Sequence, residues 1–175
     1  MSETYLIALG SNMRHPRFGA PRRVLVAALE EMERQALDVI ATSPIVASAP
    51  LGPSRRRYAN AAALIETDLE PVELLAQLQD IEHSFGRRRR GQRWRGRVLD
   101  LDIVLWSGGI HASSQLAIPH PLFRTRSFVL GPAAAIAPGW RDPVGGRTLR
   151  QLKARLTRPR PLPRCGACQA TRLGP

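Results

Sequence analysis

Four short apolar stretches alternate with two segments of helical period, and their order along the chain limits the fold more than any other feature. The stretches predicted as strands lie at residues 4–9, 39–48, 59–66 and 98–106. Each predicted helix begins at a proline, Pro21 or Pro71, whose fixed φ suits the first helical position. The order strand, helix, strand, strand, helix, strand is that of the split βαβ arrangement. We therefore predict an α+β, ferredoxin-like βαββαβ fold, with an antiparallel four-stranded sheet and helices packed on one face.

The part of the chain that follows these elements indicates additions to the same unit and no second domain. Residues 119–138 and 148–156 predict further loop and helix, and no linker or internal repeat divides the chain. We predict a single domain at residues 1–157. The remaining residues, 158–175, are rich in arginine and proline, which is typical of a disordered tail.

Both cysteines, Cys165 and Cys168, lie in that tail. A zinc site would need a second pair of ligands, and a redox motif would open a helix, so we interpret the two thiols as incidental. No stretch approaches the ~20 apolar residues of a membrane span, and no charged leader with an apolar core opens the chain. We therefore expect a cytoplasmic protein that does not use a membrane.

The run GRRRRGQRWRGRVLDLD, at residues 86–102, carries seven arginines and ends on two aspartates. Guanidinium groups hold phosphate oxygens bidentately, and hard divalent cations need carboxylates fixed on a rigid element. On a strand, Asp100 and Asp102 share one face and stand roughly 7 Å apart along it, while Leu101 and Ile103 share the other face. Two such aspartates are often simply solvated, but beside an arginine-rich loop they can hold two metal ions that clamp an in-line displacement. The run therefore predicts phosphoryl-transfer chemistry.

The net charge of +12 at pH 7 arises in two regions, residues 87–97 and 143–175, which hold basic side chains and no acidic ones. An arginine-rich loop on a ferredoxin-like sheet is also compatible with an RNA-binding module. Such a module needs aromatic side chains on its central strands, whereas the strand here presents Asp100 and Asp102, which repel phosphate unless a metal intervenes. We expect nucleic-acid binding to be weak at most and confined to the basic tail.

Seven short motifs point to a family when they are taken together. They are YLIALGSNM at 5–13, APLGP at 49–53, YAN at 58–60, QDIE at 79–82, GRRRRGQRWRGRVLDLDIVLW at 86–106, IPHP at 118–121 and RSFVLGPAAAIAP at 126–138. In order and spacing they resemble the 6-hydroxymethyl-7,8-dihydropterin pyrophosphokinase family of folate biosynthesis. The resemblance implies an enzyme that transfers the β,γ-pyrophosphoryl group of ATP to the hydroxymethyl group of a reduced pterin and releases AMP. It also implies two Mg²⁺ ions, with ATP as co-substrate.

The same resemblance implies roles for individual side chains. Asp100 and Asp102 would bind the metal ions, and Arg87 and Arg97 would act with them in catalysis. The residues expected to bind ATP are Gln79, Glu82, Arg89, Trp94, Ile103, His120 and Arg126. The residues expected to bind the pterin are Gly10, Ser48, Leu51, Tyr58, Asn60, Trp94 and Phe128.

Two positions depart from the family pattern. Gln115 and Ala117 stand where well-known members have an arginine and a threonine that contact the nucleotide, which predicts a weaker or rearranged grip on ATP. A different interpretation of the same residues is a pterin or nucleotide binder without turnover, in which replacing either aspartate by alanine would leave ligand binding unchanged. In both cases the expected partners are small molecules, and the expected state is a monomer.

Overall fold

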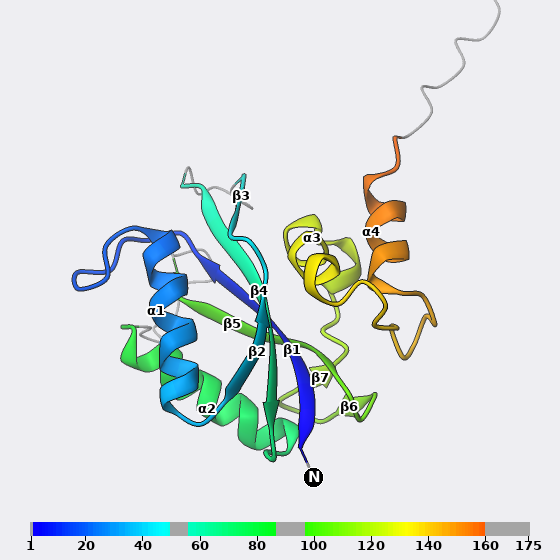
Figure 1. The fold of residues 1–175 in the computed structure, drawn as a ribbon, viewed down its shortest axis with the longest axis horizontal. Helices are drawn as coiled ribbons and strands as arrows, with labels where there is room; N and C mark the ends of the chain where they lie inside the picture. The colour runs from blue at the N-terminus through cyan, green and yellow to red at the C-terminus, as the bar shows by residue number, and fades with distance from the viewer. Residues whose placement is uncertain (1, 50–55, 87–96, 160–175) are drawn as a thin grey trace, which may run out of the picture.

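A computed structural model describes residues 2–49, 56–86 and 97–159 (Figure 1). Its main sheet contains β1 (Glu3–Ser11), β2 (Asp38–Thr42), β4 (Tyr58–Thr67) and β5 (Asp100–Trp106), in the spatial order β2-β4-β1-β5. A short strand, β3 (Val46–Ser48), also pairs with β4. All these pairs are antiparallel, so the predicted ferredoxin-like topology is confirmed.

Two helices cover one face of the sheet. They are α1 (Pro21–Arg34) and α2 (Pro71–Ser84), and each begins at its proline as predicted. Glu70 and Glu73 form a reciprocal capping box at the start of α2, which satisfies two of its free backbone N–H groups. The apolar stripes of both helices pack against the side chains of β1, β4 and β5 that point to this face. This larger core fixes the face of β5 on which Leu101 and Ile103 lie.

The opposite face of the sheet is covered by the additional helix expected after the fourth predicted strand. The helix α3 (Ser127–Ile136) packs there, α4 (Leu149–Thr157) packs against α3, and apolar residues of both helices form a second core with β1, β4 and β5 (Figure 1). Thr148 caps α4 by accepting a hydrogen bond from the Gln151 N–H at 3.2 Å. The predicted C-terminal additions therefore form a second helical layer.

The predicted strand at residues 39–48 is in fact two strands. Ser43 and Pro44 separate β2 from β3: proline has no N–H for the ladder, and the buried Ser43 hydroxyl accepts the Ala62 N–H at 2.9 Å instead. The strand predicted to begin at residue 98 begins two residues later, at Asp100.

A small hairpin and a short helical turn connect β5 to α3. The hairpin consists of β6 (His111–Ala112) and β7 (Ala117–Ile118), and the turn is the 3₁₀ helix η1 (Phe123–Thr125). Within the described ranges, no helix is long and apolar enough to cross a membrane.

Candidate functional site

The two aspartates of β5 lie on the face of the sheet on which α3 packs. In the pairing of β5 with β1, Asp102 lies opposite Ala8 and Asp100 lies opposite Gly10. Directly opposed residues of antiparallel strands point to the same face, and Ala8 belongs to the second core. The aspartates therefore share a face, as strand alternation predicts, and both are only partly exposed.

Gly10, near the end of β1, leaves an open position on this face. It pairs with Asp100 on one side and with Asn60 of β4 on the other. A Cβ at this position would lie 3.8 Å from the Asn60 Oδ1 and 3.9 Å from the Asp100 Cβ, so the two side chains flank the space above the glycine. A ligand can approach the strand backbone here because no side chain covers it.

Several residues expected to bind the pterin gather beside this position. Asn60 is buried and donates a hydrogen bond from Nδ2 to the Ser48 hydroxyl at 2.9 Å. Ser48 pairs with Tyr58 across β3 and β4. Phe128, at the start of α3, is partly exposed and lies under the Arg126 guanidinium, which is 5.9 Å from the ring centre. The fold thus brings together amide, hydroxyl and aromatic groups from three elements.

Positively charged groups surround the aspartates. The Arg97 guanidinium donates to the Asp100 Oδ2 at 2.5 Å. Burial would lower the pKa of Arg97, but the charge of Asp100 and the hydrogen bond to it outweigh that effect and raise it. Burial also raises the pKa of Asp102, as does the charge of Asp100, while His120, Arg126 and Arg97 act in the opposite direction. Asp102 is therefore a carboxylate whose negative charge is incompletely compensated by this chain.

His120 and Arg126 reach the aspartates from opposite ends of η1. The His120 N–H donates to the Val104 carbonyl at 3.0 Å, which ties this segment to β5. Burial is the main cause of a lowered pKa for the His120 imidazole, and Arg126 lowers it further, although Asp102 raises it. Burial and Arg126 therefore favour the neutral form of the imidazole, and the permanent positive charge on this side comes from Arg126.

A buried ion pair holds η1 in place. Arg124 donates from Nε and Nη2 to the two carboxylate oxygens of Asp142, at 2.7 and 2.6 Å. Asp142 is 1% exposed and also accepts the Val144 N–H at 3.1 Å. Sequence reasoning missed this pair because no periodic pattern connects a residue of a short helical turn with one 18 positions further along the chain.

Glu82 and Gln79 of α2 lie on the other side of β5. Glu82 is buried, and its Oε1 accepts the backbone N–H of Leu101 at 2.8 Å. Ile103 is also buried on this side, in the core beneath α1 and α2. Gln79, Glu82 and Ile103 therefore do not share the face on which the two aspartates lie.

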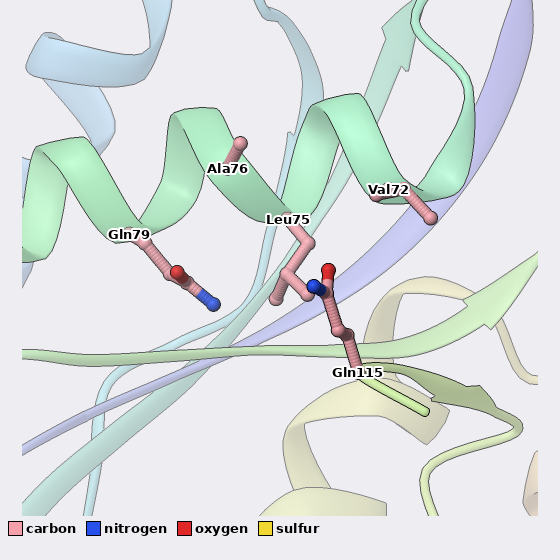
Figure 2. Close-up of a pocket in the computed structure, with 5 residues that line it drawn as sticks. All are labelled: Val72, Leu75, Ala76, Gln79 and Gln115. Carbon is pink, nitrogen blue, oxygen red and sulfur yellow. The ribbon is translucent and has the colours of Figure 1, made fainter. Parts of the chain in front are cut away.

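A pocket of about 390 Å³ lies between α2 and the hairpin of β6 and β7. It is lined by Val72, Leu75, Ala76, Gln79 and Gln115. Figure 2 shows Gln79 extending from α2 and Gln115 reaching toward the helix from the β6–β7 connection, with Leu75 beside it. Two amides and an apolar wall thus surround a space large enough for a flat heterocycle.

Four of the expected site residues, Leu51, Arg87, Arg89 and Trp94, lie outside the described residues. Among the residues that are described, no group of three or more histidine, cysteine, aspartate or glutamate side chains gathers as a metal cage. The two aspartates nevertheless supply carboxylate oxygens, the ligands that Mg²⁺ prefers, and Mg²⁺ commonly takes further ligands from water and substrate phosphates.

Comparison with known proteins identifies relatives over most of the chain. Residues 6–138 match the family model of 7,8-dihydro-6-hydroxymethylpterin-pyrophosphokinase (HPPK). A Pseudomonas aeruginosa protein named 2-amino-4-hydroxy-6-hydroxymethyldihydropteridine pyrophosphokinase is 40% identical over 156 residues, covering 88% of this chain and 92% of its own. A Haemophilus influenzae protein of the same name is 42% identical over 136 residues, covering 77% of this chain and 81% of its own.

The fold is also found in solved structures. The wild-type Plasmodium falciparum HPPK-DHPS matches 89% of this chain with a TM-score of 0.67 at 12% sequence identity. The match spans 45% of that longer protein. At this level of identity the likeness establishes the fold, and the curated relatives establish the family.

Proposed function

This chain belongs to the 7,8-dihydro-6-hydroxymethylpterin-pyrophosphokinase family, and we propose that it transfers the pyrophosphoryl group of ATP to the hydroxymethyl group of 6-hydroxymethyl-7,8-dihydropterin. The products would be the pterin diphosphate and AMP. Members of this family are ATP-dependent diphosphotransferases of folate biosynthesis, so the enzyme class follows from membership. The observation that carries the finer proposal is the pair Asp100 and Asp102, flanked by Arg97, His120 and Arg126 on one face of the sheet.

The aspartate pair fits two Mg²⁺ ions. Asp102 is a mostly buried carboxylate whose raised pKa reflects burial and the neighbouring Asp100, and bound divalent cations would relieve both effects. We assign both aspartates as metal ligands on this basis. When bound, Mg²⁺ supplies the positive charge that neutralises the triphosphate and the charge that shifts between its oxygens during transfer.

The cationic side chains would hold the phosphates. Arg97 and Arg126 approach the aspartates from different segments, so they can contact different oxygens of one triphosphate chain. Bidentate guanidinium contacts fix orientation as well as charge, which favours an in-line approach of the pterin hydroxyl. In its neutral form, which burial favours, His120 can donate one N–H to a phosphate oxygen without adding a full charge.

The pterin would bind over Gly10. Asn60 donates from Nδ2 to Ser48, which orients its amide and leaves Oδ1 beside the open space. An acceptor in this position suits the amino and ring N–H groups of a pterin. Tyr58 and Phe128 supply aromatic faces that can stack on the ring, each worth about 1 kcal/mol beyond burial.

The nucleotide base would enter the pocket between α2 and the hairpin. Leu75 and Ala76 supply apolar contact, and Gln79 and Gln115 supply amide donors and acceptors for a purine edge. Glu82 would act indirectly, because its carboxylate holds the Leu101 N–H between the two aspartates. Ile103 would contribute from the core beneath α1 and α2.

The roles of Arg87 and Arg89 in binding and catalysis, of Trp94 in closing over both substrates and of Leu51 at the pterin remain part of the proposal. They rest on the resemblance of residues 49–53 and 86–106 to the family motifs. Closure of an arginine-rich lid would exclude water and so protect ATP from hydrolysis before the pterin arrives.

The test is AMP formation from ATP and Mg²⁺, with and without 6-hydroxymethyl-7,8-dihydropterin. Pterin-dependent AMP that disappears in Asp102→Asn supports pyrophosphoryl transfer and the metal role together. A folded protein that binds both ligands but forms no AMP would instead support a binder without turnover.

A further inference from the structure

Asn12, the residue directly after β1, holds the backbone of Arg97 from both sides. The Asn12 N–H donates to the Arg97 carbonyl at 3.0 Å, and the Asn12 Oδ1 accepts the Arg97 N–H at 2.7 Å. These bonds lie beyond the β1–β5 ladder, whose last pair is Gly10 with Asp100. Asn12 therefore supplies the contacts that β-sheet pairing does not provide at Arg97.

The consequence of this clamp reaches the metal site. Arg97 carries the guanidinium that donates to the Asp100 Oδ2 at 2.5 Å, and its side chain is 47% exposed. Few neighbouring atoms restrict the rotamers of a long, half-exposed side chain. The position of its backbone therefore largely decides where its guanidinium group lies. Asn12 fixes that backbone.

The loop that contains Asn12 is itself well held. His15 and Gly19 exchange two backbone hydrogen bonds of 2.8 Å, which close a tight turn. The His15 ring stacks on Phe18 at 4.7 Å between ring centres, and Phe18 stacks on Phe85 at 4.9 Å. Phe85 follows directly on the end of α2 and is buried. The loop is thus fixed against the larger core, and Asn12 is a firm support.

We propose that Asn12 is a positioning residue for pyrophosphoryl transfer, acting through Arg97 to place its guanidinium at Asp100 and the transferring phosphates. This inference rests on the proposed function. The Asn12 side chain is 3% exposed, and its Nδ2 has no hydrogen-bond partner among the described residues. Among the described residues, its side chain hydrogen-bonds through Oδ1 to the Arg97 N–H. The hydrogen-bond acceptor is therefore the group of Asn12 that positions Arg97.

A double-mutant cycle tests this role. Asn12→Leu removes the acceptor with little change in volume, Asn12→Asp keeps it, and Arg97→Ala removes the group on which Asn12 acts. We expect Asn12→Leu to lower kcat roughly 10- to 100-fold, the scale of a displacement of about 1 Å in a reacting site. The KM for the pterin should change little, and Asn12→Asp should restore most of kcat. In the Arg97→Ala background, Asn12→Leu should have no further effect on kcat.

Thr148→Ala is the matched control, because it also removes a side-chain acceptor of a backbone N–H but lies in the cap of α4. It should leave kcat unchanged in both backgrounds. The proposal would be overturned if Asn12→Leu lowered kcat equally in the wild-type and Arg97→Ala backgrounds. It would also be overturned if folded Asn12→Leu kept an unchanged kcat. If Asn12→Leu does not fold, Asn12→Ser replaces it in the double-mutant cycle. Serine keeps a polar group, but its hydroxyl is too short to accept the Arg97 N–H.

The wild-type protein separates this test from that of the proposed function. If it forms no pterin-dependent AMP, the proposed function fails. The cycle is then measured as Mg²⁺-dependent binding of a non-hydrolysable ATP analogue by calorimetry. Non-additive losses of affinity would support the action of Asn12 through Arg97, and additive losses would refute it.

Discussion

Replacing Arg124 with methionine should lower the free energy of unfolding by about 3 kcal/mol, because the Asp142 carboxylate then stays buried without its partner. The two hydrogen bonds of 2.7 and 2.6 Å join a guanidinium of η1 to a carboxylate that is 1% exposed. Loss of one partner of a buried pair costs ~3–5 kcal/mol. The lower end applies here because the Arg124 side chain is 32% exposed, so water can reach the site after the substitution.

Replacing Asp142, the other partner of the pair, should lower the free energy of unfolding by less. In Asp142→Asn the amide oxygen still accepts the Val144 N–H, and the Arg124 guanidinium can turn toward solvent. We expect a loss of about 1–2 kcal/mol, the range for one buried hydrogen bond to a charged group. The order of the two variants distinguishes a buried-charge penalty from a simple loss of contact, which would be equal for both.

The loss of stability in Arg124→Met should also become smaller at low pH. Burial raises the pKa of Asp142, but the hydrogen bonds from Arg124 and from the backbone outweigh it, so the pKa lies below its ordinary value. A carboxyl with a lowered folded pKa stabilises the fold above its unfolded pKa of about 3.9, and this stability is lost as pH falls through the folded pKa. The difference between wild type and Arg124→Met should therefore shrink as the pH falls below about 4.

Urea unfolding followed by circular dichroism at pH 7 measures these differences, and a loss of 3 kcal/mol should lower Tm by about 6–12 °C. Arg141→Met is the matched control, since Arg141 is exposed and donates to a loop carbonyl, that of Gly146, at 2.9 Å. It should change stability by less than about 0.5 kcal/mol. The reasoning fails if Arg124→Met is no worse than Arg141→Met, or if Asp142→Asn costs more than Arg124→Met.

Three further predictions concern the site and the domain. Asp102→Asn should abolish pterin-dependent AMP formation but raise Tm in the absence of Mg²⁺, because the raised pKa of Asp102 indicates that its buried charge is unfavourable in the fold. Mg²⁺ should raise the Tm of the wild type and not that of the variant, and an equal rise in both would exclude Asp102 as a ligand. Gln115→Arg should lower the KM for ATP about fivefold, as expected for ~1 kcal/mol from one added contact to the nucleotide. Steady-state kinetics that show an unchanged or higher KM for ATP would argue against a nucleotide at this pocket. Deleting residues 158–175 should leave kcat within about twofold and Tm nearly unchanged, because α4 ends at Thr157; a large loss of either would place the tail in the fold or the site.

Sequence reasoning was strong where a local pattern decides the structure. The apolar stripes and the prolines at Pro21 and Pro71 gave both helices, and strand alternation placed Asp100 and Asp102 on one face. It failed at residues 39–48, where Ser43 and Pro44 break an otherwise apolar stretch. There the serine hydroxyl replaces a ladder hydrogen bond, and such a replacement is visible only once β4 lies beside it.

The additional helices were predicted, but the face of the sheet on which they pack was not. The segment at α3 is apolar, and without knowledge of the sheet its apolar side chains could not be assigned to a face. Contacts between segments far apart in the sequence could not be predicted either. Asn12 and Arg97 are 85 positions apart, and the bonds between them follow from the end of β1 lying beside the start of β5. Periodicity carries no information of this kind, because it records only which face a residue occupies.

The loop at residues 12–19 touches the chain on each side of residues 87–96, at Phe85 through stacked rings and at Arg97 through Asn12. The two ends of this stretch are therefore held by contacts that do not involve its own side chains. For protein engineering, these two anchoring contacts make residues 87–96 a segment that can be exchanged while the carboxylates of β5 stay in place. A chimera that takes the corresponding segment from the Pseudomonas aeruginosa relative should therefore keep the Tm of this chain.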